Sequence, residues 1–535
     1  MQLQARSVST PAMWRALFVL CLGSFAILLD MTIVNVAVPS MLDALHAGLD
    51  DVLWVLNAYL LAFAVLLITA GRLGDVFGQR TLFVTGLAVF TVASAACGLA
   101  PNSAALIGAR VLQGVGAALL TPQALAIIMA TFPAQRRGAA LGILAGISGL
   151  ASVSGPSLGG VIVTYVDWRW IFFINLPIGL VAIVLSFLWV PAVRTGRRHR
   201  LDLVGVVLGT AGLLAILFGL IEGQRYEWGT VAGGVTIPEI LGAGAVLIAA
   251  FLLWERVRPQ ALLPLGLFRN RNFAVWTALT AAPWFALSGF LLTITINNQT
   301  VLGMSAVQAG LTSLPMTIVL AAVAPLSGRL TDRVGGKYLV VAGLLLFATG
   351  IVLVGLVDWT GATSLTFTAP LAVAGLGMGL VFAPLTTEAL RDVAPAMAGA
   401  ASGVLSTTRQ LGSALGGAVV GAVLWNQLAG ALHTRAVSAS SQLPPPARRP
   451  FVDGFAGAVR GGLQVGRGES GGAQVPPGLP APLADQLRAL IHEVFVNAFV
   501  AAVRPTLAVA AAGPVLGALA CLVLVRRRQS SEDIA

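Results

Sequence analysis

Long apolar runs, separated by short segments that hold most of the glycine, proline and charged residues, dominate the chain. A bilayer core about 30 Å thick needs about 20 apolar residues of helix, so each run predicts a transmembrane helix. The predicted spans are residues 14–38, 52–71, 81–100, 104–129, 138–164, 170–190, 203–221, 235–254, 273–298, 308–328, 338–357, 366–390, 398–426 and 500–525.

Composition supports the same class. Of 535 residues, 57% are hydrophobic and 10% are charged, and the mean hydropathy is +0.90. That leaves too little polar surface for a water-soluble globule. The apolar runs are also too long for an outer-membrane barrel, whose strands alternate over about ten residues. The sequence therefore predicts an all-α polytopic membrane protein, and its net charge of +11 does not indicate nucleic acid.

The position of the basic residues predicts the orientation. They gather in alternate connecting segments, among them a linker with Arg194, Arg197, Arg198 and Arg200, whereas the short segments on the other side hold only Arg169 and Arg225. The positive-inside rule then places both termini in the cytoplasm. Lys337 is the only lysine, which indicates a GC-rich genome and a bacterial cytoplasmic membrane.

One long connection interrupts this pattern, at about 427–499. Its part from Ser438 to Pro482 is rich in Pro, Gly and Ser and predicts disorder, so a simple extracytoplasmic tether is the favoured interpretation. Residues 483–499 have helical apolar spacing, and the alternative is a helix that lies along the outer membrane surface.

Internal repetition predicts the architecture. The sequence Gly71 to Arg80 returns as Gly328 to Lys337, and the sequence at 138–144 returns at 399–405 with nearly the same separation. Eight spans rather than six separate the copies, so two helices have been inserted between six-helix halves. The predicted domains are residues 1–190, a linker with two extra helices at 191–272, and residues 273–535.

The repeated motif joins two helices on the cytoplasmic side. Its glycines, Gly71 first among them, allow a tight turn, Asp75 lies near a helix start, and Arg80 can pair with it or with lipid phosphate. An ordinary charged turn would explain one copy. Because Asp332 occupies the equivalent place in the second copy, the motif indicates a cytoplasmic gate between the halves.

Two deep ionisable residues are candidates for proton coupling. Asp30 lies about 13 Å and Arg110 about 9 Å from the outer ends of their spans, so the two side chains can meet. Such a pair can exchange its salt bridge for a protonated acid and a free base, or it can be a static ion pair. Proton transfer would depend on carboxylates, because all four histidines lie outside the predicted spans: His46, His199, His433 and His492.

The fifth span carries a proline among small residues, namely Gly155, Pro156, Gly159 and Gly160. Proline removes a helix hydrogen bond and glycine permits close helix contact, so this span is predicted to bend and to pack tightly. Simple helix packing is the alternative explanation.

Aromatic and polar residues within the spans are candidates for a cavity that binds amphipathic molecules. Trp54 and residues 297–299 are assigned to the membrane interface instead, where such residues are common. The candidate cavity residues are Asn35, Tyr59, Gln113, Trp284, Phe285, Glu388 and Arg409.

No enzyme signature is present. The sequence has no nucleotide-binding Gly-Lys-Ser/Thr loop and no His-Glu-x-x-His helix. The three cysteines lie singly within apolar runs, which indicates neither disulfides nor a metal site. We therefore expect no catalytic residue, metal or cofactor.

Five motifs in order resemble the fourteen-span drug:proton antiporter branch of the major facilitator superfamily. They are Leu29 to Pro39, Gly71 to Arg80, Leu106 to Ala118, Gly155 to Gly160 and Trp168 to Gly179. The resemblance implies that Arg110 and Gln113 belong to a proton-transfer motif and that Gly155 and Pro156 belong to an antiporter motif. Ala151 departs from that antiporter motif, which usually has glycine there.

The expected function is proton-driven export of hydrophobic or amphipathic small molecules such as drugs and antibiotics, by a monomer in contact with membrane lipids. The proton gradient would be the energy source. The alternatives are a dedicated exporter of one endogenous metabolite or lipid, a proton-coupled importer, and a receptor that does not transport.

Overall fold

The computed structural model describes residues 10–45, 49–192, 202–258, 261–357, 359, 363, 365–443, 445–460 and 481–524. Fourteen helices within these residues are long and apolar enough to cross a membrane. The predicted helical membrane fold is therefore confirmed. The arginine-rich part of the linker, Arg194 to Arg200, lies outside the described residues.

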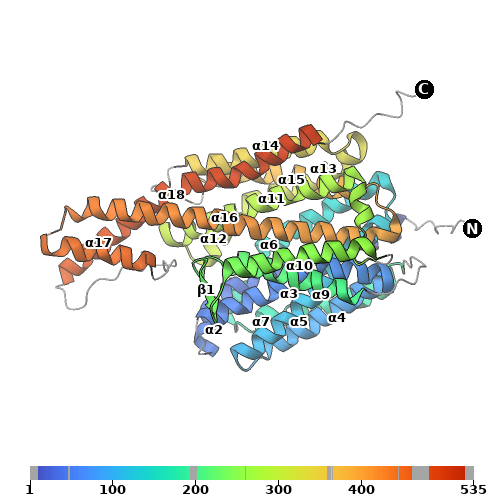
Figure 1. The fold of residues 1–535 in the computed structure, drawn as a ribbon, viewed down its shortest axis with the longest axis horizontal. Coiled ribbons are helices and arrows are strands. Elements are labelled where there is room, and N and C mark those ends of the chain that lie inside the picture. Colours follow the sequence, from blue (N-terminus) through green and yellow to red (C-terminus); the bar gives the residue numbers. More distant parts are fainter. Residues whose placement is uncertain are drawn as a thin grey trace, which may run out of the picture.

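The first half of the chain forms helices that run back and forth through the bundle (Figure 1). Several begin at polar caps: the Asn102 side chain, for example, accepts a hydrogen bond of 2.9 Å from the N–H of Ala105. The elements are α1 (Thr10–Ile33), η1 (Val34–Ala37), α2 (Val38–Leu45), α3 (Leu49–Phe77), α4 (Gln79–Gly98), α5 (Ser103–Thr131), α6 (Ala134–Tyr165), α7 (Trp170–Phe173) and α8 (Asn175–Trp189).

The second half repeats this arrangement with longer final helices. A capping box formed by Ser305 and Gln308 starts the short helix that precedes its second span. The elements are η2 (Leu265–Arg269), α11 (Arg271–Ile296), η3 (Asn297–Val301), α12 (Ala306–Thr312), α13 (Leu314–Val334), α14 (Lys337–Leu356), α15 (Thr368–Leu390), η4 (Pro395–Met397), α16 (Ala398–Ser440), α17 (Pro445–Arg460) and α18 (Ala481–Leu524).

The inserted pair consists of α9 (Leu203–Glu222) and α10 (Ile237–Val257), joined through the short antiparallel strands β1 (Thr230–Ala232) and β2 (Val235–Thr236). Helix α9 contacts both α3 and α16, one from each half. Phe218 stacks on Trp54, and the Asn57 side chain donates a hydrogen bond of 2.6 Å to Glu222. The insertion therefore covers one seam between the halves.

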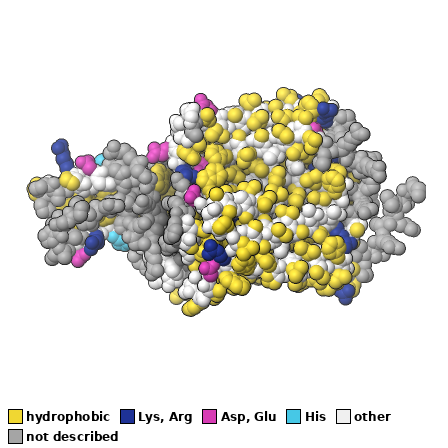
Figure 2. Space-filling model, turned by 90° about the horizontal axis from the view of Figure 1, so that it is seen from below, with side chains coloured by type: hydrophobic (Ala, Val, Ile, Leu, Met, Phe, Trp, Pro, Cys, Tyr) yellow, Lys and Arg dark blue, Asp and Glu magenta, His cyan; other side chains and the backbone are white. Residues whose placement is uncertain are grey.

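An apolar belt surrounds the bundle. Figure 2 shows hydrophobic side chains over most of the visible lateral surface, with the charged groups gathered toward its two ends. Large aliphatic and aromatic residues are exposed within it, such as Val92, Phe187 and Leu253. Exposed apolar surface of this extent fits lipid chains rather than water.

The turn in the repeated motif is shorter than the sequence predicted. Helix α3 continues through Gly71 to Phe77, and the chain breaks only at Gly78, whose φ is 98°. The second copy breaks at Gly335, with φ of 82°. Residues with a Cβ rarely adopt such φ values, so these two positions favour glycine strongly. We call the end of the bundle that holds Gly78 and Gly335 the motif end.

At the opposite end, the prediction of a long loop at 427–499 is wrong. Helix α16 continues to Ser440, α17 follows, and α18 begins at Ala481, so residues 483–499 belong to the last span's own helix rather than to a separate surface helix. These segments extend beyond the other helices (Figure 1) around an apolar core that includes Leu432, Phe455 and Phe495. His433 and His492 lie in this extension. Residues 461–480, His46 and His199 lie outside the described part.

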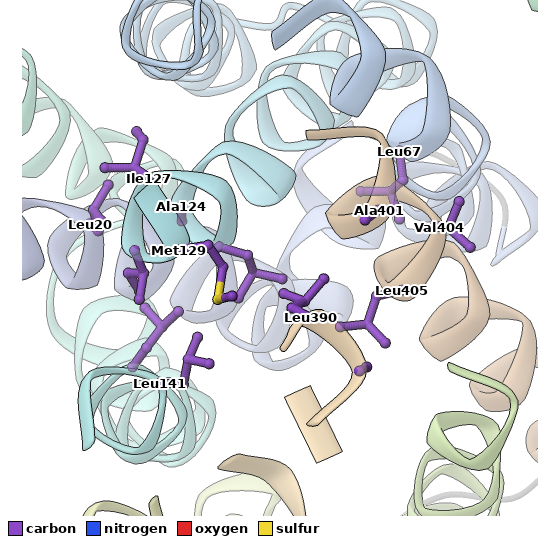
Figure 3. Packing of buried hydrophobic residues seen from close by; sticks show 14 of the residues in the cluster. Leu20, Leu67, Ala124, Ile127, Met129, Leu141, Leu390, Ala401, Val404 and Leu405 are labelled. Carbon is purple, nitrogen blue, oxygen red and sulfur yellow. The ribbon is translucent and has the colours of Figure 1, made fainter. Parts of the chain in front are cut away.

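Apolar side chains close the seam between the halves near the motif end. One buried cluster joins residues of α1, α3, α5 and α6 to residues of α15 and α16. In Figure 3, Leu67 of α3 lies beside Ala401 of α16, and Leu390 of α15 lies between Met129 and Leu405. Packing of this kind seals the bundle against water at that level.

The backbone at Gly78 provides a test of this geometry. We expect Gly78→Ala to lower the thermal unfolding temperature of the purified protein, because alanine is strained at φ of 98°. Gly108→Ala is the matched control, since Gly108 is helical and a Cβ there has open space; that change should leave stability equal or raise it by about 0.5–1 kcal/mol. Equal destabilisation by both changes would contradict the assignment.

Candidate functional site

Asp30 is fully buried in α1. Its Oδ2 lies 2.5 Å from Nη1 of Arg110 on α5. Its Oδ1 accepts hydrogen bonds from the side-chain amides of Gln113 (2.8 Å) and Asn175 (2.9 Å). One charged donor and two amide donors from α5 and α8 therefore compensate the carboxylate, as a buried charge requires.

Arg110 is equally buried, at 1% exposure. Besides Asp30, its guanidinium donates to the carbonyl oxygen of Val55 on α3 (3.1 Å) and to Oε1 of Gln113 (2.6 Å). The ring of Tyr59 lies 4.2 Å from the guanidinium carbon, a cation–π contact. Arg110 thus links three helices of the first half, α1, α3 and α5, around one buried charge pair.

The side chains of Asn175 and Ser94 belong to this network but were not among the predicted site residues. Asn175 begins α8 directly after a break at Ile174, and Ser94 of α4 accepts a hydrogen bond of 2.7 Å from Gln113. The motif Trp168 to Gly179 contains Asn175, but neither its residue type nor its spacing indicates that the amide faces Asp30. Nothing in the sequence distinguishes Ser94 from the other small residues of its span.

The predicted gate residues form two equivalent contacts across the seam. Asp75 of α3 accepts hydrogen bonds from the backbone N–H groups of Gly399 (2.9 Å) and Ala400 (2.9 Å), near the start of α16. Asp332 of α13 accepts them from Gly138 (2.9 Å) and Ala139 (3.2 Å), near the start of α6. A carboxylate at a helix start is favoured by the helix dipole. Each half thus supplies an acid that holds a helix of the other half.

Glycines make this approach possible. A Cβ on Gly71 would collide with the backbone of Gly399, and one on Gly138 would collide with that of Gly328. Arg80 contributes differently, because its guanidinium donates to the carbonyl of Phe187 at 2.6 Å. The motif end is closed by direct backbone packing in this structure.

The glycines of the fifth span pack against α1. A Cβ on Gly155 would collide with Thr32, and one on Gly159 would come within 2.8 Å of Ile33, while Gly160 is also buried. Pro156 faces α12 instead, because a Cβ added to Gly310 of that helix would lie 2.7 Å from the Cβ of Pro156. This stretch of α6 therefore contacts its own half through Gly155 and Gly159 and the other half through Pro156.

Three of the candidate cavity residues lie elsewhere. Glu388 is at the motif end, where its carboxylate accepts from the Gly336 N–H (2.7 Å) and pairs with Arg391 (2.6 Å). Phe285 contacts Gly513 of α18, which packs within the second half. Tyr59 is fully buried against Arg110. Packing and charge pairing occupy these three side chains in this structure, and a role for them in a substrate cavity stays a prediction.

The remaining candidates divide between the two halves. Gln113 belongs to the Asp30 network, and Asn35 is exposed on η1, where its amide donates to the carbonyls of Met31 and Thr32. Arg409 of α16 donates to Oγ1 of Thr386 at 2.5 Å. Trp284 of α11 stacks on Phe382 of α15, with ring centroids 5.1 Å apart.

Comparisons with known proteins agree with this architecture. The sequence model of the Major Facilitator Superfamily matches residues 20–417. The chain is 35% identical to the tetracenomycin C resistance and export protein of Streptomyces glaucescens, over 98% of this chain and 93% of that protein. It is 36% identical to the multidrug resistance protein Stp of Mycobacterium tuberculosis, over 80% of this chain and 78% of that protein.

Among solved structures, the fold is similar to that of the proton:xylose symporter XylE. The TM-score is 0.57 at 14% sequence identity, and the match covers 96% of this chain and 95% of that chain. At this identity the likeness concerns the fold alone.

The buried pair predicts strong coupling between its two residues. We expect Asp30→Asn and Arg110→Gln each to lower the free energy of unfolding by about 3 kcal/mol, because each leaves a buried group without its charged partner. The double variant should lose less than the sum of the two. Unfolding by titration with sodium dodecyl sulfate measures all three losses.

The pair Asp485 and Arg488 is the matched control, at 2.8 Å with both side chains about two-thirds exposed or more. Exposed pairs contribute little, so Asp485→Asn and Arg488→Gln should be nearly additive. Additivity at both pairs would contradict a tightly coupled Asp30 network.

Proposed function

The chain belongs to the major facilitator superfamily, and we propose that it exports hydrophobic or amphipathic small molecules across a bacterial cytoplasmic membrane in exchange for protons. It is a multi-pass membrane protein. The printed names of its relatives describe multidrug resistance and antibiotic export, which supports a transporter of drug-like molecules rather than an enzyme. The observation that carries the proton coupling is the buried pair of Asp30 and Arg110.

Protonation of Asp30 would change the network in a defined way. A neutral carboxyl no longer balances the charge of Arg110. Its protonated oxygen also becomes a hydrogen-bond donor, so the carboxyl can accept fewer hydrogen bonds. The helices that Asp30 joins, α1, α5 and α8, then lose part of what holds them together. A proton at this position would therefore bias how the first half packs, which is what coupling to transport requires.

Closure at the motif end supports alternation between two states. We assign this end to the cytoplasm, with both chain termini there, from the charge pattern of the connecting segments. Asp75 and Asp332 would hold α16 and α6 while that end is closed and release them when it opens. Pro156, which meets Gly310 across the seam, would serve gating rather than substrate binding. We propose that one chain suffices as a monomer surrounded by lipid.

A dedicated exporter of one compound is the second candidate, because one relative is named for tetracenomycin C alone. Competition separates the two. A broad exporter loses transport of one fluorescent substrate when chemically unrelated compounds are added, whereas a dedicated exporter keeps it.

The test of the proposed coupling is transport in reconstituted vesicles with an imposed pH gradient. We expect Asp30→Asn to insert into the membrane but to lose pH-driven transport, because an amide cannot exchange a proton. Arg110→Ala should abolish transport, and Arg110→Lys should retain a part, since lysine keeps the charge but lacks the planar guanidinium.

Asp485→Asn is the control for this series, because it changes an exposed acid far along the chain in α18. It should transport as the wild type does. Unchanged pH-driven transport in Asp30→Asn would refute the role of this carboxyl.

The contact of Asp75 generates a separate test of gating. In a background without the three cysteines, Ala401→Cys introduces a thiol at a fully buried position beside Leu67 (Figure 3). We expect Asp75→Ala to raise the rate at which a membrane-impermeant maleimide labels this thiol several-fold, because α16 loses its cap. Asp392→Ala, an acid at the same end that accepts from Asn272 within its own half, is the control and should leave labelling slow.

A further inference from the structure

Arg409 is an unbalanced charge inside the second half. It lies 11 residues after the start of α16, about 16 Å into a bilayer about 30 Å thick at 1.5 Å per residue. Among the described residues, its one hydrogen-bond partner is the hydroxyl of Thr386, and none of their carboxylates forms an ion pair with it. A charge at that depth is costly and marks a functional position.

The polar residues around Arg409 share one side of α16. This side lies between Gly403, which contacts α3, and Gly412, which contacts α11. The exposed side of the helix is a different one and carries Leu415, which is 43% exposed. The side therefore faces the interior of the bundle rather than lipid. Its members recur every three or four residues: Ser402, Ser406, Arg409 and Ser413.

Two donors at this place are buried without a protein acceptor among the described residues. They are Nε of Arg409 and Nε1 of Trp284. The two donors are linked through α15. Trp284 stacks on Phe382 of this helix, and Arg409 donates to Thr386, which lies one helical turn after Phe382. Both groups can donate but not accept, so only a ligand with acceptor atoms can satisfy them.

Charge and shape then narrow the class of ligand. An anionic oxygen matches both the donors and the uncompensated guanidinium. The stacked rings of Trp284 and Phe382, inclined by 22°, supply an adjacent flat apolar surface. The first half offers no equivalent, because the position that corresponds to Arg409 in the repeat is Ser148, whose hydroxyl donates to the carbonyl of Leu144 at 2.7 Å.

We propose that Arg409 and Trp284 form the binding site for the anionic group of aromatic substrates, such as an aromatic carboxylate or sulfonate. This inference rests on the proposed export function and specifies its substrate class. The site recognises the ligand's charge in the second half, while the Asp30 network in the first half is already balanced by its own residues.

The test uses two probes with the same aromatic rings. Anilinonaphthalene sulfonate is anionic, and phenylnaphthylamine lacks the sulfonate and is neutral. Equilibrium dialysis measures their binding to the purified protein in nanodiscs of zwitterionic lipid, so that no anionic lipid headgroup competes. We expect Arg409→Gln to weaken binding of the anionic probe at least about tenfold more than binding of the neutral probe.

Two further variants separate charge from packing. Arg409→Lys should recover part of the loss for the anionic probe, because it keeps the charge. Arg504→Gln removes a positive charge from an exposed position on α18 and should leave the ratio of the two affinities unchanged. Equal loss of both probes in Arg409→Gln, or no loss of either, would overturn the anion site.

Measurements on the wild-type protein keep the proposal testable if Arg409→Gln cannot be purified. Octanesulfonate should displace the anionic probe, and octanol at the same concentration should not; displacement by both alike would overturn the site. Transport assays in vesicles with a pH gradient distinguish failure of the anion site from failure of the proposed export function. Export of the neutral probe without binding of the anionic one overturns the anion site alone, and export of neither overturns the proposed function with it.

Discussion

The burial of a carboxylate and a guanidinium inside an apolar bundle is the constraint on which the first half depends. Either residue without the other would be an uncompensated buried charge, which is costly, and each needs further hydrogen bonds to its remaining atoms. Gln113, Asn175, Ser94 and the carbonyl of Val55 supply or support these bonds from four helices. The position of one charge pair therefore fixes how α3, α4, α5 and α8 sit around α1.

Contacts between the halves follow a different rule, because they have to form and separate. They combine backbone packing at glycine with two carboxylates that cap helices of the opposite half. Beside the apolar cluster near the motif end, these contacts use carboxylate and backbone groups that can bind water when the halves separate. A seam of this kind is compatible with the proposed alternation of access, whereas the Asp30 network lies wholly within one half.

Some of the site could be predicted from the residues and some could not. Asp30 and Arg110 stood out because charges are scarce in the spans, and the acids of the repeated motif stood out because they recur. Asn175 and Ser94 are ordinary polar residues whose meaning depends on what they face. Glu388 and Phe285 show the reverse: their residue types suit a cavity, but in this structure Glu388 accepts a backbone hydrogen bond near a helix start and Phe285 packs between helices.

The sequence by itself determined the number of membrane helices, the two-half architecture and the inserted pair, because hydrophobic length and internal repetition are properties of the chain order. Only the tertiary structure decided which polar residues meet. It brought Asp75 to α16 and left Arg409 without a carboxylate partner among the described residues. It also continued α16 to Ser440 and formed α17 within the segment for which Pro-, Gly- and Ser-rich composition predicted disorder. The physical reason is that apolar helices can pack with many rotations about their axes. The face that each helix turns inward is set by close contacts at small residues and by pairing of buried charges, which join residues far apart in the chain.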